Sequence, residues 1–203
     1  MRYLNKIVFI NSAAIRYSEV QLDGNIHLIG TQGVGKSTIL RAILFFYNAD
    51  TQRLGIPVEK KSYQDYYFPY ADSSIIYEVA REDGWFTVLS YKTMNRICYR
   101  FIASPYRPDL FIDEEGAPYP SDRIRSVLDK NGIKYSGAIS TYEEYRNILY
   151  GNSDNKRDYS CYSLMESGSY QNIIRTIQNV LLNSRLEADY IKQTIITLSL
   201  IHI

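Results

Sequence analysis

The feature that most constrains this chain is a glycine-rich stretch near its start, "NIHLIGTQGVGKSTIL". Glycines stand at positions 30, 33 and 35, and Lys36 and Ser37 follow directly. An apolar run over residues 25–29 precedes the glycines, and apolar side chains recur at helical spacing from about residue 36 to residue 48. The pattern predicts a strand over 25–29, a tight turn, and then an α-helix with one buried face.

The turn has the spacing G-x-x-x-x-G-K-[ST], in which each residue type has a physical role. Glycines let backbone N–H groups approach phosphate oxygens closely, and the following helix adds the positive end of its dipole. Lys36 is placed to reach the β- and γ-phosphates, and the Ser37 hydroxyl is a hard ligand for Mg²⁺. Thr38 adds a hydroxyl for the α-phosphate. The predicted binding residues are Gly30, Thr31, Gln32, Gly33, Val34, Gly35, Lys36, Ser37 and Thr38.

Composition narrows the class of protein further. The chain has 203 residues and a net charge of +1, which suits one domain without a general attraction to nucleic acid. Its two cysteines, Cys98 and Cys161, have neither disulfide-framework nor zinc spacing, which favours a reducing cytoplasm. No apolar run reaches the length of a membrane helix. The 20 tyrosines favour β structure.

The remaining segments predict a single domain, 1–203, with three regions. Residues 1–50 hold two strands, the glycine turn and a helix. Residues 73–116 contain short aromatic and β-branched runs, which predict an antiparallel meander. Residues 121–203 read as mainly helical, with Ser121 and Ser140 as expected N-caps and Gly132 and Gly151 as stops.

Hydrolysis of a nucleotide requires an acidic residue that holds the metal, and the best local match is "LFIDEE", with Asp113 and Glu114. Only three apolar residues precede Asp113, whereas buried parallel strands show longer apolar runs. A strand that enters a solvated hairpin turn is therefore the favoured interpretation. We predict no catalytic residue in this chain. It would supply the nucleotide-binding half of an active site without the catalytic half.

The glycine turn and the order of the elements resemble the N-terminal head lobe of the SMC-like ATPases, which include condensin, MukB-type proteins and the Wadjet ATPase. The resemblance implies an α/β P-loop NTPase fold of the ABC-head type, with an antiparallel β-rich insert and C-terminal helices. It implies ATP and Mg²⁺ as cofactors and polar nucleotide contacts from Asn11 and Ser12. The nearest candidate for the family's Q-loop glutamine is Gln171, for which a surface amide on a helix is the favoured alternative. Family loops usually carry Asn where this chain has Gln32.

In that family the first lobe is followed by a coiled coil, and a C-terminal lobe supplies the catalytic acid. The stripe of apolar residues over 186–196 is therefore expected to begin a coiled coil, and the chain to be a fragment. Expected partners are the C-terminal lobe of the same protein, a second head that pairs on ATP binding, and DNA. Lys92, Arg96 and Arg100 predict either a DNA-facing strand or the ordinary polar face of a sheet. A complete small P-loop enzyme and a non-hydrolysing nucleotide sensor remain alternatives.

Overall fold

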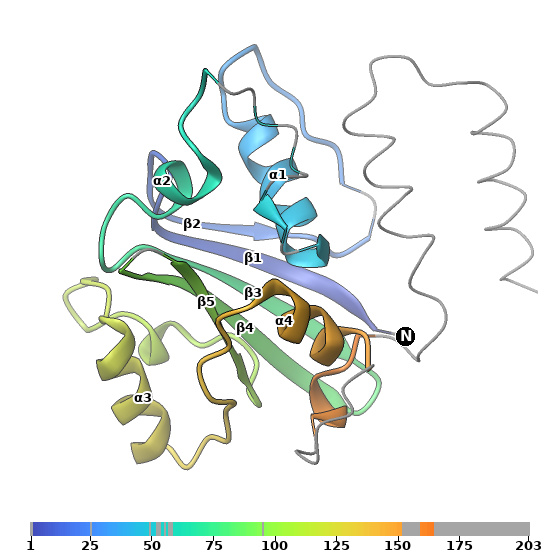
Figure 1. Ribbon diagram of the computed structural model, residues 1–203, viewed down its shortest axis with the longest axis vertical. Coiled ribbons are helices and arrows are strands. Elements are labelled where there is room, and N and C mark those ends of the chain that lie inside the picture. The colour runs from blue at the N-terminus through green and yellow to red at the C-terminus, as the bar shows by residue number, and fades with distance from the viewer. Residues whose placement is uncertain are drawn as a thin grey trace, which may run out of the picture.

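The computed structural model describes residues 2–24, 26–48, 50–51, 54, 56, 59–94, 96–151 and 159–164. Within these ranges the chain forms one five-stranded sheet with helices on both of its faces (Figure 1). The elements are β1 (Tyr3–Ser12), β2 (Ile15–Gln21), α1 (Lys36–Asn48), α2 (Tyr63–Tyr67), β3 (Ser74–Arg81), β4 (Gly84–Thr93), β5 (Arg96–Ile102), η2 (Pro108–Leu110), α3 (Ser121–Lys130), α4 (Tyr142–Leu149) and η3 (Ser160–Tyr162).

The strands lie in the order β2-β1-β3-β4-β5, and each neighbouring pair is antiparallel. Strands β3, β4 and β5 form the meander that the sequence predicts. The two-residue connection between β3 and β4 ends at Gly84, whose φ of 143° few other residues adopt. Strand β2 was not predicted: it follows β1 through a tight turn at Ala13, where φ is 55°.

Residues that alternate along the strands separate into two apolar clusters, one on each face of the sheet. Ile7 and Phe9 of β1 pack with α1, α2 and α4, whereas Val8 and Ile10 pack with α3 and the segment around η2. The alternation arises because successive side chains in a strand point to opposite faces. The glycine turn and α1 are therefore separated from α3 by the full thickness of the sheet (Figure 1).

The predicted strand immediately before the glycine turn is absent, and this expectation was wrong for residues 26–29. Both hydrogen-bonding edges of β1 are already occupied, by β2 and by β3, so this segment has no place beside β1. Ile29 is 91% exposed and Ile26 is 41% exposed, although both are aliphatic. The chain therefore enters the loop as an irregular segment with unburied apolar side chains.

Helices α1, α3 and α4 lie where the sequence predicts them, with small differences at the caps. Helix α1 has the predicted bounds, Lys36–Asn48. Pro120, not Ser121, occupies the N-cap of α3, and Thr141, not Ser140, caps α4 by accepting a hydrogen bond from the Glu144 N–H. Each cap is displaced by one residue from its expected position, which changes neither the face that the helix buries nor its direction.

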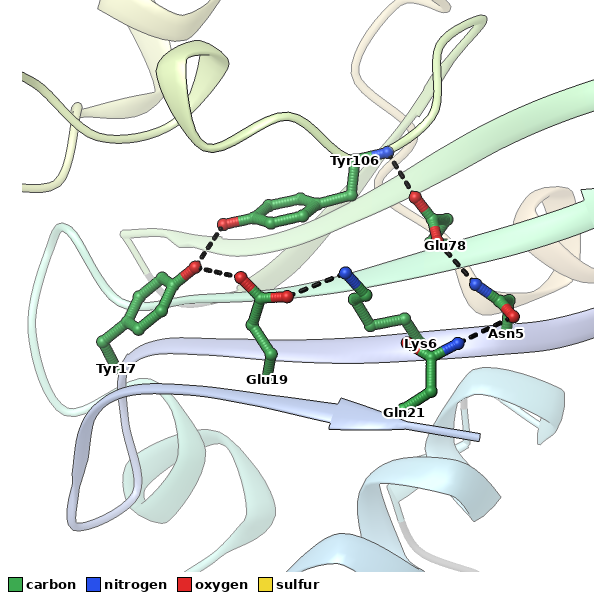
Figure 2. Close-up of polar contacts among 7 residues, drawn as sticks. All are labelled: Asn5, Lys6, Tyr17, Glu19, Gln21, Glu78 and Tyr106. Atoms are coloured by element: carbon green, nitrogen blue, oxygen red, sulfur yellow. Dashed lines mark hydrogen bonds and ion pairs between the residues drawn. The ribbon is translucent and has the colours of Figure 1, made fainter. Parts of the chain in front are cut away.

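A buried polar network joins three strands to the segment after β5 (Figure 2). The Glu78 carboxylate, on β3, is only 6% exposed. It accepts hydrogen bonds from Asn5 Nδ2 and from the Tyr106 backbone N–H, both at 2.7 Å. Asn5 Oδ1 in turn accepts from Gln21 Nε2 at 2.9 Å. Each oxygen of the buried carboxyl group thus has a hydrogen-bond donor, as a buried polar group requires.

The network continues toward solvent through a second group of side chains (Figure 2). Tyr106 and Tyr17 share a hydrogen bond between their hydroxyls at 3.1 Å, and the Tyr17 hydroxyl donates to Glu19 Oε1. Lys6 Nζ lies 2.8 Å from the other oxygen of Glu19. Burial is the largest influence on the pKa of Glu19 and acts upward, but the donors Lys6 and Tyr17 together hold that pKa below its usual value. The network fixes the segment after β5, which contains Tyr106, against the face of the sheet that α3 covers.

Candidate functional site

The glycine turn adopts a backbone that only glycine tolerates easily. Gly33 and Gly35 have φ angles of 90° and 93°, in a region that L-residues rarely adopt. No heavy atom lies within 4 Å of the position that a Cβ would take at either residue, so space alone does not require glycine there. The backbone conformation therefore explains why glycine stands at both positions. The space around them is open to a ligand.

The Lys36 side chain folds back onto the loop that precedes it. Its Nζ atom donates to the carbonyl oxygens of Gly30 and Thr31, at 2.5 and 2.6 Å. The ammonium group is thus held inside the curve of the turn, close to the backbone that precedes it. A bound anion would compete with these carbonyls for the same charged donor, and a charge-assisted contact with phosphate is the stronger of the two.

The first turn of α1 offers unused donors to the same space. The N–H groups of Thr38 and Ile39 both bond to the carbonyl of Gly35. Among the described residues no acceptor meets the N–H groups of Lys36 and Ser37, as expected at a helix start. No acidic side chain occupies this first turn. The positive end of the helix dipole therefore faces the loop without a compensating carboxylate.

A cavity of about 690 Å³ opens in front of this helix end, within the size range of ligand pockets. Its described lining includes four cationic side chains, from Lys36, Arg41, Lys60 and Lys61, and no carboxylate. The other lining residues are Gln32, Gly33, Gly35, Ser37, Thr38, Ile56, Tyr66 and Tyr67. Clustered positive charge around an open cavity favours a polyanionic ligand.

The far wall of the cavity is formed by α2 and the residues before it. Ser62 caps this short helix: its Oγ accepts from the Asp65 N–H and donates to the Asp65 carboxylate. This hydrogen bond, followed by the charges of Lys92 and Lys61, holds the pKa of Asp65 below its usual value. The helix is therefore anchored at its first turn and presents Tyr66 and Tyr67 to the cavity.

Among the described residues, four tyrosine hydroxyls donate to backbone carbonyls of α1 along most of its length. Tyr67 bonds to the carbonyl of Thr38 at 2.8 Å and Tyr77 to that of Ala42 at 3.1 Å. At the other end of α1, the hydroxyls of Tyr145 and Tyr150 donate to the carbonyls of Phe46 and Tyr47, each at 2.6 Å. The carbonyls at 38, 42 and 46 share one face of the helix, because they stand four residues apart. These bonds hold α1 against α2, β3 and α4.

Sequence reasoning did not identify this role for the tyrosines. It related them to strand propensity, whereas several of the largest buried side chains are tyrosines that contact α1 from other elements. A detectable signal was present nonetheless. A buried tyrosine hydroxyl usually finds a hydrogen-bond partner, and the chain has 20 tyrosines against 7 phenylalanines.

Asn11 and Ser12 do not belong to the cavity lining, so the expectation of direct nucleotide contacts from them is not met by the geometry. Ser12 has no exposed surface, and its Oγ donates to the carbonyl of Tyr67 at 2.8 Å. Asn11 Nδ2 instead bonds to Asp72 at 2.9 Å. Ser12 thus supports the wall of the cavity from behind. Gln171 and the expected coiled-coil segment, residues 186–196, lie outside the described residues.

The acids of "LFIDEE" lie far from the cavity in the fold. The expected strand is reduced to a single bridge between Ile112 and Pro118 that closes a tight turn. Asp113 stabilises this turn, because its carboxylate accepts from the N–H groups of Glu115 and Ala117. The turn follows η2 on the α3 face, opposite to α1. A turn was the favoured interpretation from the sequence, and Asp113 performs a structural task in it.

The basic residues of β4 and β5 do not form one surface. Lys92 pairs with Ile97 in the sheet and lies on the α1 face, where its Nζ is 3.6 Å from Asp65. Arg100 lies on the opposite face and is 4% exposed, with its guanidinium over the rings of Tyr91 and Tyr135. The sequence left two interpretations of Lys92, Arg96 and Arg100 open, a DNA-facing strand surface and the ordinary polar face of a sheet. Because Lys92 and Arg100 lie on opposite faces, neither interpretation holds for all three residues.

In the described part of the chain, no three histidine, cysteine, aspartate or glutamate side chains gather into a possible metal site. The Ser37 hydroxyl in the cavity is the predicted metal ligand, and a single hydroxyl suits a Mg²⁺ ion that keeps waters and phosphate oxygens as its other ligands. The residues present therefore fit a metal that arrives together with a phosphate ligand.

No described helix is long and apolar enough to cross a membrane.

Comparisons with other proteins place the chain in a family. No curated protein matches the chain. Residues 11–198 match the family described as protein of unknown function (DUF3584), and because this match covers most of the chain, the protein is a member of that family.

Proposed function

We propose that this chain is the ATP-binding lobe of a cytoplasmic SMC-like ATPase. The observation that carries the proposal is the union of three features in one cavity: a loop with the phosphate-binding spacing, an uncompensated helix start, and four cationic side chains. Each feature alone is common, whereas together they form a site for a polyphosphate. In this proposal Lys36 binds the β- and γ-phosphates and Ser37 binds Mg²⁺, which neutralises phosphate charge when it is bound.

The exposed segment before the loop supports the proposal that a second lobe completes the fold. Ile26, Ile29 and Val34 leave apolar surface uncovered around the entrance to the loop, and Ile29 is almost fully exposed. Exposed apolar side chains that gather into one patch mark a surface for a partner. In the SMC-like arrangement that partner is the C-terminal lobe of the same protein, which would also supply the α/β core of the P-loop fold. The second head and DNA would join the full assembly.

Among the alternatives, a complete small hydrolase receives the least support. The described lining of the cavity contains no carboxylate that could hold a metal or orient a water molecule. The two acids that the sequence offers, Asp113 and Glu114, lie on the other face of the sheet. We therefore expect ATP binding without turnover by this chain alone. Robust phosphate release that disappears on Asp113→Asn or Glu114→Gln would restore the complete-enzyme alternative.

The direct test is calorimetric titration of the 203-residue chain with ATP in the presence of Mg²⁺. Lys36→Ala removes a charge-assisted contact, which costs about 2 kcal/mol or roughly a thirtyfold loss of affinity. Lys130→Ala is the matched control, because Lys130 is an exposed lysine at the end of α3, on the opposite face. The control should bind like the wild type. Equal affinities for the wild type and Lys36→Ala would refute the proposed site.

A further inference from the structure

The cavity is larger than the phosphate groups need, and one wall of it is aromatic. Its volume is about 690 Å³, whereas the loop and the start of α1 occupy only one side. Tyr66 projects from α2 on the other side and is 38% exposed, although the neighbouring Tyr67 is buried. Half-exposed aromatic rings that line a cavity offer a flat apolar surface to a ligand.

The position of Tyr66 relative to the loop indicates which part of a nucleotide it would meet. Along the first turn of α1, Lys36 and Ser37 are assigned to the terminal phosphates and Thr38 to the α-phosphate. The Tyr66 hydroxyl lies 3.5 Å from the Thr38 hydroxyl. Because the nucleoside is attached to the α-phosphate, it extends from Thr38, and Tyr66 lies directly beside that residue.

The ring of Tyr66 is also held in a defined orientation. It packs edge-to-face with the buried ring of Tyr67, with centroids 5.1 Å apart and an interplanar angle of 82°. Tyr67 is itself fixed by its hydrogen bond to the carbonyl of Thr38. A side chain that is ordered before the ligand arrives loses little conformational entropy on binding. Tyr66 is thus preorganised beside Thr38, the residue assigned to the α-phosphate.

We propose that Tyr66 is the stacking surface for the nucleobase of the bound nucleotide. This inference rests on the proposed nucleotide site and adds the position of the base within it. Stacking requires only a π face, so Tyr66 contributes affinity for the nucleoside without a hydrogen-bond reading of the base. Lys36 and Arg41 of α1 then bind the phosphates, and the Tyr66 ring binds the opposite end of the same ligand.

The test compares two ligands, ATP and inorganic tripolyphosphate, each titrated into the wild-type chain and its variants with Mg²⁺ present. Tyr66→Ala should weaken ATP by about tenfold, the value typical of one lost stacking contact, and leave tripolyphosphate within about twofold of the wild type. Tyr66→Phe should bind both ligands like the wild type, because it keeps the ring. Tyr66→Leu, which keeps apolar volume without a ring, should behave like Tyr66→Ala.

The control is Tyr70→Ala, which removes an exposed tyrosine close to α2 that does not line the cavity. It should change neither affinity. An equal loss of ATP and tripolyphosphate affinity in Tyr66→Ala would overturn the proposal, because the ring would then support the loop. Unchanged ATP affinity in Tyr66→Ala, or a loss in Tyr66→Phe, would overturn it as well. Failure of the underlying site is distinguishable, since neither ligand would then depend on Lys36.

Discussion

The hydroxyl of Tyr67 donates to the carbonyl of Thr38 at 2.8 Å and so connects the far wall of the cavity to the first turn of α1. The two residues belong to different elements and stand 29 positions apart in the sequence. Burial raises the pKa of Tyr67 well above its ordinary value, and the charge of Arg41 offsets this only in part. The phenol therefore remains a donor throughout the neutral range.

Replacing Tyr67 with phenylalanine should affect both stability and binding. The lost hydrogen bond lowers the free energy of unfolding by about 1 kcal/mol, and the released Thr38 weakens ATP binding by roughly threefold. The control is Tyr145→Phe, which removes a comparable bond to the carbonyl of Phe46 at the other end of α1. Denaturant unfolding should show similar losses for both variants, and calorimetry should show weaker binding only for Tyr67→Phe. Equal affinities in the two variants would contradict the link to the loop.

A substitution at Gly35 should separate the needs of the loop from those of overall stability. Alanine at a φ of 93° is strained by about 1 kcal/mol or more, so Gly35→Ala should shift the backbone N–H groups of the proposed phosphate site. Gly116 offers a matched control, because its φ is 81° and its Cβ position is equally open. Both variants should lose similar stability, whereas ATP affinity should fall only in Gly35→Ala. A binding loss in Gly116→Ala would indicate that the effect is not local.

Replacing the buried Glu78 should cost more stability than replacing the exposed acid in the same network. In Glu78→Gln one of the two donors, Asn5 Nδ2 or the Tyr106 N–H, loses its acceptor and remains buried, at a cost of about 2 kcal/mol. Glu19→Gln affects a partly exposed ion pair with Lys6 and should cost less than about 1 kcal/mol. Urea unfolding monitored by circular dichroism measures the difference. A larger loss for Glu19→Gln would show that the network is not organised around Glu78.

Alkaline pH should unfold the protein through its buried tyrosines. Burial raises the pKa of Tyr47 to about 12 and raises those of Tyr77 and Tyr145 as well. An unfolded phenol ionises near pH 10, so the stability from these neutral groups is fully present below about pH 10. It is lost progressively as the pH rises through the folded pKa values, because the unfolded chain binds fewer protons there.

Unfolding free energies measured from neutral pH to above pH 10 should therefore fall on the alkaline side, together with a rise in tyrosinate absorbance. Tyr47→Phe removes one of the shifted groups and should make this fall shallower. The matched control is Tyr70→Phe, since Tyr70 is largely exposed and should leave the slope unchanged. A stability that stays constant above pH 10 would mean that these tyrosines ionise without unfolding the chain.

Features that depend on a few consecutive residues could be predicted from the sequence. The loop is one example, because the glycine spacing encodes a backbone with positive φ at Gly33 and Gly35. Helix α1 is another, since its apolar periodicity and the glycine turn before it specify its bounds, although the residues that it buries most fully include Ala42 and Phe45, which the predicted face did not contain. The β3–β4–β5 meander was predicted for the same reason: each strand carries its own β-branched and aromatic run, and a short turn separates it from the next.

Other features could be decided only by contacts between distant residues. The hydroxyl of Tyr150 meets the carbonyl of Tyr47 across 103 positions, and no local pattern specifies such a partner. Ile26 and Ile29 have strand-forming side chains but lie in an irregular segment, because β2 and β3 already occupy both edges of β1.

Strand register also decided which face of the sheet each basic residue lies on. Lys92 and Arg100 are close in sequence, but antiparallel pairing places Lys92 opposite Ile97 and Arg100 opposite Leu89, on different faces of the sheet. By itself, the sequence determined where the backbone bends at the glycine turn, since that depends on the φ preferences of neighbouring residues. Only the tertiary structure decided which side chains surround that bend, because sheet pairing and packing bring them from separate parts of the chain.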